Sequence, residues 1–286
     1  MEKIKKSRAK SFVILTIIYL AATIAGILVY ETLPFNPYIS LLIADTVATV
    51  LVYLYSVIFD NASVYDPYWS VAPIIIVLYL CFSNKVNAYT AMLVIAVLFW
   101  GIRLTTNWAY TFLGLQHQDW RYTMLKANTG RMYQLVNFVG IHLVPTLVVY
   151  ACMLPVIFAF ENETKINFGS VYFILVSIFA VLLQGISDIQ MHKFRKTKPS
   201  TFIRTGLWKH SRHPNYLGEI LMWWGIGLSV AFATGNFIVI LGAVANTLLF
   251  LCISIPLAEG KQSKKEGYAE YKKQTRALLP IKKFTK

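Results

Sequence analysis

The chain has few charged residues and few cysteines. Only 14% of its 286 residues are charged and 13 are acidic, whereas 57% are hydrophobic and the mean hydropathy is +0.55. Soluble globular domains are about a quarter charged, so this composition excludes that class and indicates an integral membrane protein. The three cysteines, Cys81, Cys152 and Cys252, are odd in number and lack the spacing of a zinc site, so we expect them to be packing residues.

Common nucleotide-binding and hydrolase motifs are also missing. The sequence contains no G-x-G-x-x-G and no G-x-x-x-x-G-K-[ST], so any nucleotide would be held without a Rossmann fold or a P-loop. It contains no G-x-S-x-G to support a Ser-His-Asp hydrolase. The five histidines are spread along the chain without ligand spacing, and we therefore predict no metal site.

Long apolar runs recur from one end of the sequence to the other. A helix of about 20 residues, rising 1.5 Å per residue, crosses the roughly 30 Å of hydrocarbon in a bilayer. Eight runs approach this length, at residues 12–30, 39–59, 69–83, 88–113, 135–160, 170–191, 217–233 and 236–257. Because some are short and Gly235-Asn236 could be a re-entrant kink, we predict an all-α polytopic membrane bundle of about seven or eight transmembrane helices.

Basic residues collect in alternate loops of this arrangement. With eight spans, 24 of the 27 Lys and Arg precede the first span, lie in residues 114–134 or 192–216, or follow residue 257. Since Lys and Arg accumulate in cytoplasmic loops, we expect a multi-pass membrane protein with both termini in the cytoplasm. The net charge of +14 is juxtamembrane and has no separate domain to present it, so we expect contact with anionic lipid and no nucleic acid.

The polar segment between the sixth and seventh spans carries most of the functional signal. Residues 187–195 read S-D-I-Q-M-H-K-F-R, and residues 204–219 read R-T-G-L-W-K-H-S-R-H-P-N-Y-L-G-E. Groups this polar beside a bilayer need an anionic or polar partner. Asp188 and Arg195 are two helical turns apart, so they either form an ion pair at a helix end or bind a ligand, with Arg195 on a phosphate.

The seventh span begins with a second set of candidate binding residues. Pro214 suits a first helical turn, where free backbone donors and the positive end of the helix dipole form an anion site. Arg204 and Arg212 converge on the same place. Asn215 and Glu219 are one turn apart and too polar to face lipid, so they either bind the ligand or link helices by hydrogen bonds.

Candidate proton donors lie in the first half of the chain. Tyr65 and Asp66 precede the third span in N-A-S-V-Y-D-P-Y-W-S, and Tyr122 ends the polar stretch Q-H-Q-D-W-R-Y. An Asp beside a Tyr at a membrane mouth could supply a proton through a hydrogen-bonded phenol, as reduction of a conjugated double bond requires. Alternatively, Asp66-Pro67 is a helix N-cap and the aromatic residues form an interfacial belt.

Three blocks of the sequence resemble a known family. They are S-D-x-Q-x-x-x-F-R, G-L-W-x-x-S-R-H-P-N-Y-L-G-E, and P-L-x-E followed by G-Y-x-E-Y-x-x-x-T-x-x-L-x-P, all within residues 187–280. Together they resemble the steroid 5α-reductase C-terminal domain superfamily, especially its bacterial members. The Y-D-P-x-W and D-x-R-Y stretches extend the likeness to most of the chain.

The resemblance implies a membrane reductase that binds NADPH on its cytoplasmic side and delivers hydride to a conjugated double bond of a steroid-like or other lipid-like enone. It implies one membrane domain, residues 1–286, with a substrate and proton-donor half (1–134) and an NADPH half (135–286). The catalytic candidates, which come from the residues of the first half and not from the resemblance, are Tyr65, Asp66 and Tyr122. The predicted cofactor-binding residues are Asp188, Arg195, Arg204, Arg212, His213, Asn215, Tyr216, Glu219 and Glu259. Of these, the resemblance implies Asp188, Arg195, Asn215, Tyr216, Glu219 and Glu259.

The predicted function is therefore NADPH-dependent reduction of a carbon–carbon double bond conjugated to a carbonyl, in an apolar substrate that arrives from the lipid. The 7 basic residues between residues 192 and 216 suit the phosphates of NADPH. The alternative is a membrane methyltransferase using S-adenosylmethionine, because isoprenylcysteine and phospholipid methyltransferases also resemble R-H-P-x-Y-x-G. A third possibility is a lipid-binding protein that kept the fold without the chemistry. The substrate and the oligomeric state stay open.

Overall fold

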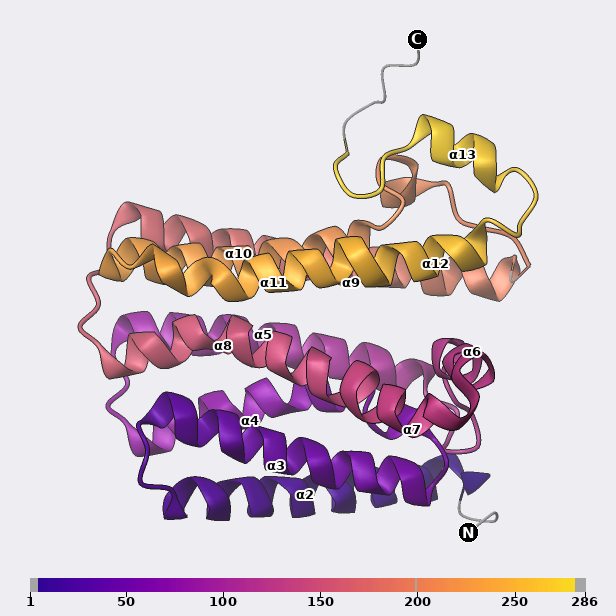
Figure 1. Ribbon diagram of the computed structural model, residues 1–286. Coiled ribbons are helices and arrows are strands. Elements are labelled where there is room, and N and C mark those ends of the chain that lie inside the picture. The colour runs from indigo at the N-terminus through magenta and orange to yellow at the C-terminus, as the bar shows by residue number, and fades with distance from the viewer. Residues whose placement is uncertain (1–4, 199, 281–286) are drawn as a thin grey trace. The chain divides into compact units, whose positions relative to one another are not determined.

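The computed structural model describes residues 5–198 and 200–280, and throughout these ranges the regular structure is helical, with no strand (Figure 1). The chain packs as two compact units, Met1–Glu161 and Asn162–Lys286. The described ranges contain eight helical segments that are long and apolar enough to cross a membrane, which confirms the predicted all-α polytopic architecture. The packing boundary follows Glu161, whereas the two halves proposed from the sequence meet at residue 134. Four basic residues of the predicted cytoplasmic side lie outside the described residues: Lys3, Lys282, Lys283 and Lys286.

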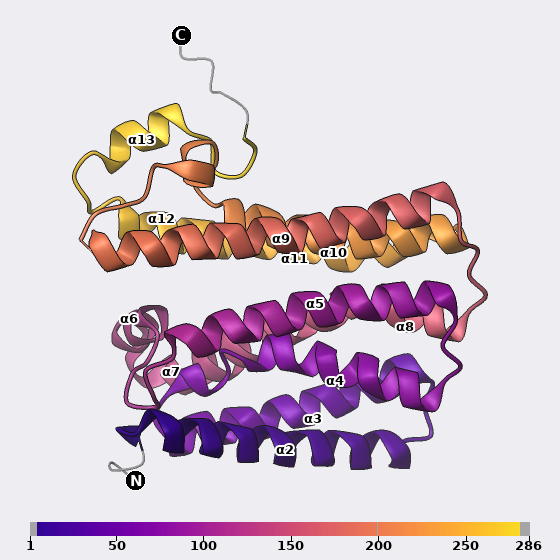
Figure 2. The ribbon, with the colours of Figure 1, turned by 180° about the vertical axis from the view of Figure 1, so that it is seen from behind.

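The first unit contains five of the eight apolar segments. Its elements are α2 (Arg8–Thr32), α3 (Pro37–Ile58), the 3-10 turn η1 (Ala62–Val64), α4 (Tyr68–Ser83), α5 (Ala88–Thr111), α6 (Trp120–Thr129), the 3-10 turn η2 (Gly130–Met132), α7 (Tyr133–Leu135), the π-helical η3 (Val136–Leu143) and α8 (Val144–Glu161). Seen from opposite sides, α2 packs along α3 and α4 along α5 (Figures 1 and 2). Short turns therefore join antiparallel neighbours.

Local capping explains where these helices begin. Asn36 accepts a hydrogen bond from the backbone N–H of Ile39 at 3.0 Å, and Pro37 occupies the first turn of α3, where its missing donor costs nothing. Asn87 and Thr90 form a reciprocal capping box at the start of α5. These polar residues satisfy backbone donors that hydrocarbon could not.

One end of the first unit is held together by side chains that bond to backbone carbonyls. Arg8 Nη2 donates to Ala109 O at 2.8 Å, and Asn61 Nδ2 donates to Leu115 O at 2.6 Å. Lys5 Nζ also donates to a carbonyl at the end of α3. The start of α2 and the ends of α3 and α5 therefore lie together, so within this unit the loops predicted to share one membrane side share one end.

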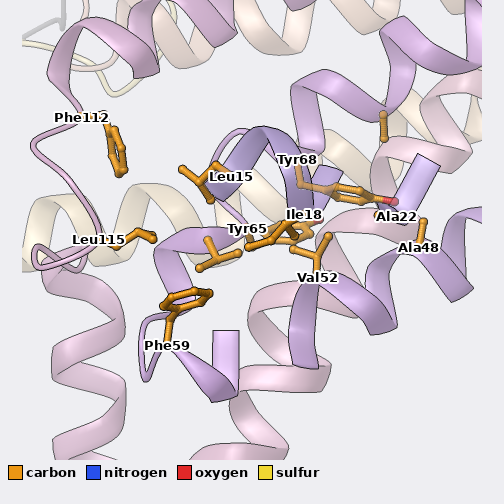
Figure 3. Close-up of a cluster of buried hydrophobic side chains, with 12 residues drawn as sticks. Leu15, Ile18, Ala22, Ala48, Val52, Phe59, Tyr65, Tyr68, Phe112 and Leu115 are labelled. Atoms are coloured by element: carbon orange, nitrogen blue, oxygen red, sulfur yellow. The ribbon is translucent and has the colours of Figure 1, made fainter. Parts of the chain in front are cut away.

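The core of the first unit combines aliphatic side chains with two tyrosines (Figure 3). Val52 is fully buried, and Tyr65 and Tyr68 are 2% and 5% exposed. The labelled members of this core are Leu15, Ile18, Ala22, Ala48, Val52, Phe59, Tyr65, Tyr68, Phe112 and Leu115. Buried phenols need hydrogen-bond partners, and these partners define the polar sites described below.

The second unit contains the remaining three apolar segments. Its elements are α9 (Phe168–Thr197), the 3-10 turn η4 (Gly206–Lys209), α10 (Pro214–Thr234), the 3-10 turn η5 (Phe237–Ile240), α11 (Leu241–Leu249), the π-helical η6 (Phe250–Ser254), α12 (Ile255–Gln262) and α13 (Tyr268–Gln274). Gly235, with φ of 76°, ends α10 in the left-handed conformation, and Asn236 caps the next segment. The last two apolar segments are thus separate helices joined by a tight turn.

Glycines let α9 and α10 approach closely. A Cβ on Gly225 would lie 2.1 Å from Ser177 Oγ and 2.7 Å from Phe173 O, and a Cβ on Gly218 would lie 2.7 Å from Ala180 O. Because lipid tails are as apolar as leucine, membrane helices associate through this kind of close backbone packing. The closely packed helices α9 and α10 carry many of the polar residues of the second unit.

Candidate functional site

Two of the three predicted catalytic residues meet in the first unit. Tyr122 donates from its hydroxyl to Asp66 Oδ1 at 2.7 Å. Beside them, Asp119 caps α6 by accepting from the backbone N–H of Arg121 at 2.8 Å, and the Arg121 Nε also donates to Asp119 at 2.8 Å. The pairing ties the start of α6 to the turn before α4.

The third predicted catalytic residue, Tyr65, faces a different partner. Its hydroxyl is 2.9 Å from Thr146 Oγ1, which in turn is 3.0 Å from Thr49 Oγ1. The alternative reading of Asp66 as a helix cap is wrong, because the N-cap of α4 is Pro67 and no side chain caps it. Asp66 is instead engaged by Tyr122.

A polar pair that the sequence reasoning missed joins α3 to α4. Tyr68 donates from its hydroxyl to Asp45 Oδ1 at 2.8 Å. Asp45 is the ninth of the 22 residues of α3, inside a segment that is otherwise apolar. Acidic side chains at membrane depth are costly and rare, and they mark functional sites. The signal was present in the sequence as a lone acidic residue within the run 39–59.

A cavity of about 70 Å³, open on one side, adjoins this pair. It is lined mainly by apolar side chains of α2, α3 and α4: Ala22, Thr23, Gly26, Ile27, Tyr30, Leu41, Ala44, Asp45, Ala48, Tyr68, Ala72, Ile75, Ile76 and Tyr79. Figure 3 shows Ala22, Ala48 and Tyr68, which belong both to the core and to the lining. The cavity therefore combines mainly apolar walls with two tyrosines whose hydroxyls bond to carboxylates: Tyr68 bonds to Asp45, which also lines the cavity, and Tyr79 bonds to Glu31.

The π-helical segment η3 places a histidine against Tyr65 of the first unit's hydrophobic core. His142 is fully buried, its Nδ1 is 2.9 Å from Asn137 O, and its ring centroid is 4.7 Å from that of Tyr65. Its Nε2 has no hydrogen-bond partner among the residues that the structure describes. Single π-helical turns are frequent near functional sites, but His142 does not line the cavity.

In the second unit, the sequence blocks of the polar segment bond directly to one another. Gln190 Oε1 accepts from the backbone N–H of Leu207 at 2.9 Å, and Trp208 Nε1 donates to Ser187 O at 3.2 Å. Gly206 has φ of +60°, and a Cβ there would lie 2.5 Å from Gln190 Oε1. Part of the S-D-I-Q and G-L-W pattern therefore builds the turn that leads into α10.

Arg212 and Glu259 form a buried ion pair at the start of α10. Arg212 Nε donates to Glu259 Oε1 at 2.7 Å, and both side chains are less than a tenth exposed. Arg212 Nη1 donates to the carbonyls of Lys272 and Thr275, and Lys272 Nζ lies 2.6 Å from Glu259 Oε2. The guanidinium is thus engaged by a carboxylate and by the backbone around α13.

Backbone hydrogen bonds fasten the residues after α13 to the start of α10. The N–H groups of Arg212 and His213 donate to Arg276 O and Ala277 O, each at 3.0 Å. Burial, reinforced by the charge of Glu259, raises the pKa of Tyr268 to about 12. The Tyr268 phenol is therefore neutral at physiological pH. The backbone hydrogen bonds make the residues after α13 part of the cluster around Arg212.

Three further predicted cofactor residues lie on α10. Glu219 is buried and accepts from Trp223 Nε1 at 3.0 Å. Tyr216 stacks against the His213 ring at a centroid distance of 5.1 Å and an interplanar angle of 7°. The Oδ1 atom of Asn215 is buried without a hydrogen-bond partner in the described part of the chain. This oxygen could accept a hydrogen bond from a ligand.

The remaining predicted cofactor residues are more accessible. Asp188 is half-buried and Arg195 is exposed near the end of α9, where both charges act on His192 between them. Arg204 is exposed, with its guanidinium 6.0 Å from the centroid of the Phe202 ring. The structure therefore brings Arg212, His213, Tyr216 and Glu259 into one cluster and leaves Arg195 and Arg204 as accessible cations of the same unit.

The chain belongs to the family described as "Protein of unknown function (DUF1295)", which matches residues 52–275. That range covers α4, with Tyr68, and the cluster around Arg212, but it does not include Asp45. A relative from Schizosaccharomyces pombe, "Uncharacterized protein C594.04c", is 26% identical over 228 residues, 70% of this chain and 66% of that protein. The chain thus spans just under two thirds of that relative's length. No solved structure matches the chain.

Proposed function

We propose that this protein is an NADPH-dependent membrane reductase of a carbon–carbon double bond conjugated to a carbonyl in a lipid-like substrate. The observation that carries the proposal is the Asp45–Tyr68 pair, joined at 2.8 Å, on the wall of an apolar cavity inside the membrane-spanning helices. A carboxyl group at that depth is costly to bury, and residues of this kind inside membrane-spanning helices usually mark functional sites. The sequence blocks that resemble steroid 5α-reductases support the same chemistry.

The proposed proton donor is Tyr68, assisted by Asp45. With a proton on Asp45, the hydrogen bond between them reverses and the Tyr68 hydroxyl can donate to the carbonyl oxygen of an enone in the cavity. As hydride adds to the β carbon, the electron pair of the double bond moves toward that oxygen, which takes the proton and later returns one to the α carbon. Tyr65, Asp66 and Tyr122 are less suited to this role, because none of them lines the cavity.

The second unit offers groups that fit the cofactor. NADPH, when bound, supplies the hydride. The buried Asn215 Oδ1 can accept from an amide N–H, and the accessible Arg195 and Arg204 suit phosphate oxygens. Arg212 has a different proposed role, because Glu259 and backbone carbonyls already engage its guanidinium. It holds the segment around α13 in place.

The proposed orientation puts both termini in the cytoplasm. Within the first unit, the start of α2 and the ends of α3 and α5 share one end. Within the second unit, the end of α9, the start of α10 and the end of α12 also share one end. These ends carry the loops rich in Lys and Arg, as the positive-inside rule requires.

The test is a titration of the detergent-purified protein with NADPH and, separately, with S-adenosylmethionine, followed by turnover assays with enone lipids. We expect saturable NADPH binding that Asn215→Ala weakens. Tyr68→Phe should retain NADPH binding but lose about 100-fold or more in turnover, the usual contribution of a general acid. Tyr65→Phe is the matched control and should retain turnover, since its phenol bonds to Thr146 instead. If the protein binds S-adenosylmethionine but not NADPH, the reductase proposal is wrong and the methyltransferase alternative is favoured.

A further inference from the structure

The proposed reaction consumes one proton in each turnover, and that proton has to reach Asp45 inside the membrane-spanning helices. Hydride addition leaves a negative charge on the substrate oxygen, which takes a proton from Tyr68, and Asp45 must then be protonated again before the next turnover. The cavity beside this pair is lined mainly by apolar side chains, which carry no proton. The proton therefore needs another path through the first unit.

Four buried polar side chains form a stripe along the segment from α7 to α8. This polar stripe consists of Tyr133, Asn137, His142 and Thr146. The steps between its members are four, five and four residues. An α-helical turn advances by about four residues and a π-helical turn by about five, so the π-helical η3 brings His142 onto the same face as Asn137. The stripe therefore faces the interior of the first unit along its whole length.

Three members of the polar stripe carry a buried polar atom without a hydrogen-bond partner among the described residues. These atoms are the Tyr133 hydroxyl, Asn137 Oδ1 and His142 Nε2. His142 Nδ1 lies 2.9 Å from Asn137 O, and a carbonyl only accepts, so Nδ1 carries the hydrogen and Nε2 of the neutral ring is an acceptor. Buried polar atoms almost always have a partner, and internal water supplies it where protein groups do not. A hydroxyl and two acceptors suit water, which both donates and accepts.

At its inner end the polar stripe connects to the proposed proton donor. The Thr146 hydroxyl is 3.0 Å from the Thr49 hydroxyl on α3. Thr49 follows Asp45 by one helical turn, and its side chain also interacts with the Tyr68 hydroxyl. Each of these hydroxyls can donate one hydrogen while it accepts another, so a proton can pass along them to Asp45. Tyr65 bonds to Thr146 from the side and is not needed for this passage.

At its outer end the polar stripe reaches an accessible ion pair. Lys126 Nζ lies 2.6 Å from Asp60 Oδ1, and both side chains are exposed. The same ammonium group is 5.6 Å from the centroid of the Tyr133 ring. Asp60 lies just after α3, at the end of the unit where Lys5 also bonds to the backbone. Water at the surface can therefore meet the stripe beside Tyr133.

We propose that water bound along the polar stripe forms a proton route from the surface beside Asp60 to Asp45. This inference rests on the proposed reductase function and adds the source of its proton. Water on the outer side gives a proton to the lone pair of His142 Nε2, and the new N–H bond then breaks as the proton moves to water beside Thr146. The hydroxyls that follow each accept one proton and release another. Asp45 gains one proton, the surface water loses one, and no electrons are transferred.

The first test detects this water in the wild-type protein, without substrate or cofactor. X-ray pulses generate hydroxyl radicals from water around and inside the protein in nanodiscs, and mass spectrometry locates the oxidised residues. We expect oxidation of Tyr133 and His142 well above that of Met153, a fully buried control on α8 with an easily oxidised sulfur. Met153 is seven residues beyond Thr146, about 10 Å further along the helix. Oxidation of both residues no higher than that of Met153 would overturn the proposal.

The second test measures proton delivery with variants of one helix. The assay follows NADPH oxidation with a 3-oxo-4-ene steroid and with a linear 2-enal. Thr49→Val keeps a similar shape but removes the hydroxyl, so kcat should fall by about 10- to 100-fold, at most the loss expected for Tyr68→Phe. The KM for NADPH should stay unchanged, the solvent deuterium isotope effect on kcat should increase, and Thr49→Ser should restore both values. Thr46→Val is the matched control, because the Thr46 hydroxyl bonds to Leu42 O of its own helix at 2.7 Å.

The outcomes separate the proton route from the function on which it rests. Equal kcat values for Thr49→Val and Thr46→Val would overturn the route. A loss in Thr49→Val with an unchanged isotope effect would show a structural role for Thr49 and would also overturn the route. Failure of the wild type to bind NADPH would instead overturn the proposed function, and the radical oxidation would still decide whether water occupies the polar stripe.

Discussion

Replacing Arg212 by methionine should destabilise the second unit far more than replacing Lys272 by methionine. Both cations bond to the carboxylate of Glu259, at 2.7 Å from Arg212 Nε and at 2.6 Å from Lys272 Nζ. They differ in burial, because the Arg212 side chain is 6% exposed and the Lys272 side chain 52%. The comparison therefore tests burial with the acidic partner held constant.

The expected magnitudes follow from that difference. Removing one partner of a buried ion pair costs about 3–5 kcal/mol when the other charge is left uncompensated. Lys272 still bonds to Glu259 in Arg212→Met, so we expect a loss toward the lower end of that range. Arg212→Met also removes the donor to the Lys272 and Thr275 carbonyls. An exposed pair contributes about 1 kcal/mol or less, so Lys272→Met should be close to wild type. Arg212→Lys should fall between them, since one ammonium cannot reproduce the planar fork of donors.

The assay is thermal unfolding of the purified protein, combined with limited proteolysis of the segment after α12. Arg212→Met should lower the melting temperature by several degrees and expose the region around α13 to cleavage at a temperature where the wild type resists. The Lys272→Met protein serves as the matched control in both measurements. Equal losses in the two variants would refute the burial argument, because the shared carboxylate would then respond to charge number alone.

Three further outcomes can be checked by unfolding measurements. Gly225→Ala should lower the free energy of unfolding by about 1–3 kcal/mol, because its added Cβ would overpack the contact with α9. Gly227→Ala is the control and should be nearly neutral, because its added Cβ would lie 3.4 Å from its nearest neighbour, and similar losses in the two variants would contradict the close approach of α9 and α10. Tyr122→Phe should lower the free energy of unfolding by about 1–3 kcal/mol, since Asp66 would lose the hydroxyl donor at 2.7 Å. An unchanged melting temperature would show that this hydrogen bond does not contribute to stability. Burial and two neighbouring cations lower the pKa of Lys265 in the folded protein. Between that lowered pKa and the usual value of about 10.4, the unfolded chain therefore binds more protons than the folded one. Stability should therefore rise with pH in this alkaline window, and Lys265→Met should remove the rise.

The positions of the membrane-spanning helices could be predicted well from the sequence. The run 39–59 corresponds to Pro37–Ile58 and the run 88–113 to Ala88–Thr111, because hydropathy and length are what a bilayer selects. Helices extend beyond the apolar runs where polar residues continue them. The run 170–191 belongs to a helix that reaches Thr197, since basic residues carry α9 beyond the apolar stretch.

The candidate sites were harder to predict, because they depend on contacts between distant segments. The cluster around Arg212 could be anticipated in part, since Arg212, His213 and Tyr216 are close together in the sequence, although Glu259 lies on α12. Its bonds to backbone carbonyls near Thr275 could not, because a carbonyl carries no sequence signal. Asp45 and Tyr68 are 23 positions apart on different helices, and only the cost of a lone carboxyl in an apolar run points to the first of them.

The exposed lining of the cavity affects how any measurement on this protein must be read. Since lining residues such as Ile27 and Ile75 are at least partly exposed, the medium that surrounds the helices can reach the cavity. Once the bilayer is replaced by a micelle, alkyl tails of the surfactant become competing occupants at very high local concentration. Apparent affinities for an apolar compound should then depend on the tail length and shape of the surfactant, and reconstitution into vesicles or nanodiscs sets the relevant reference state.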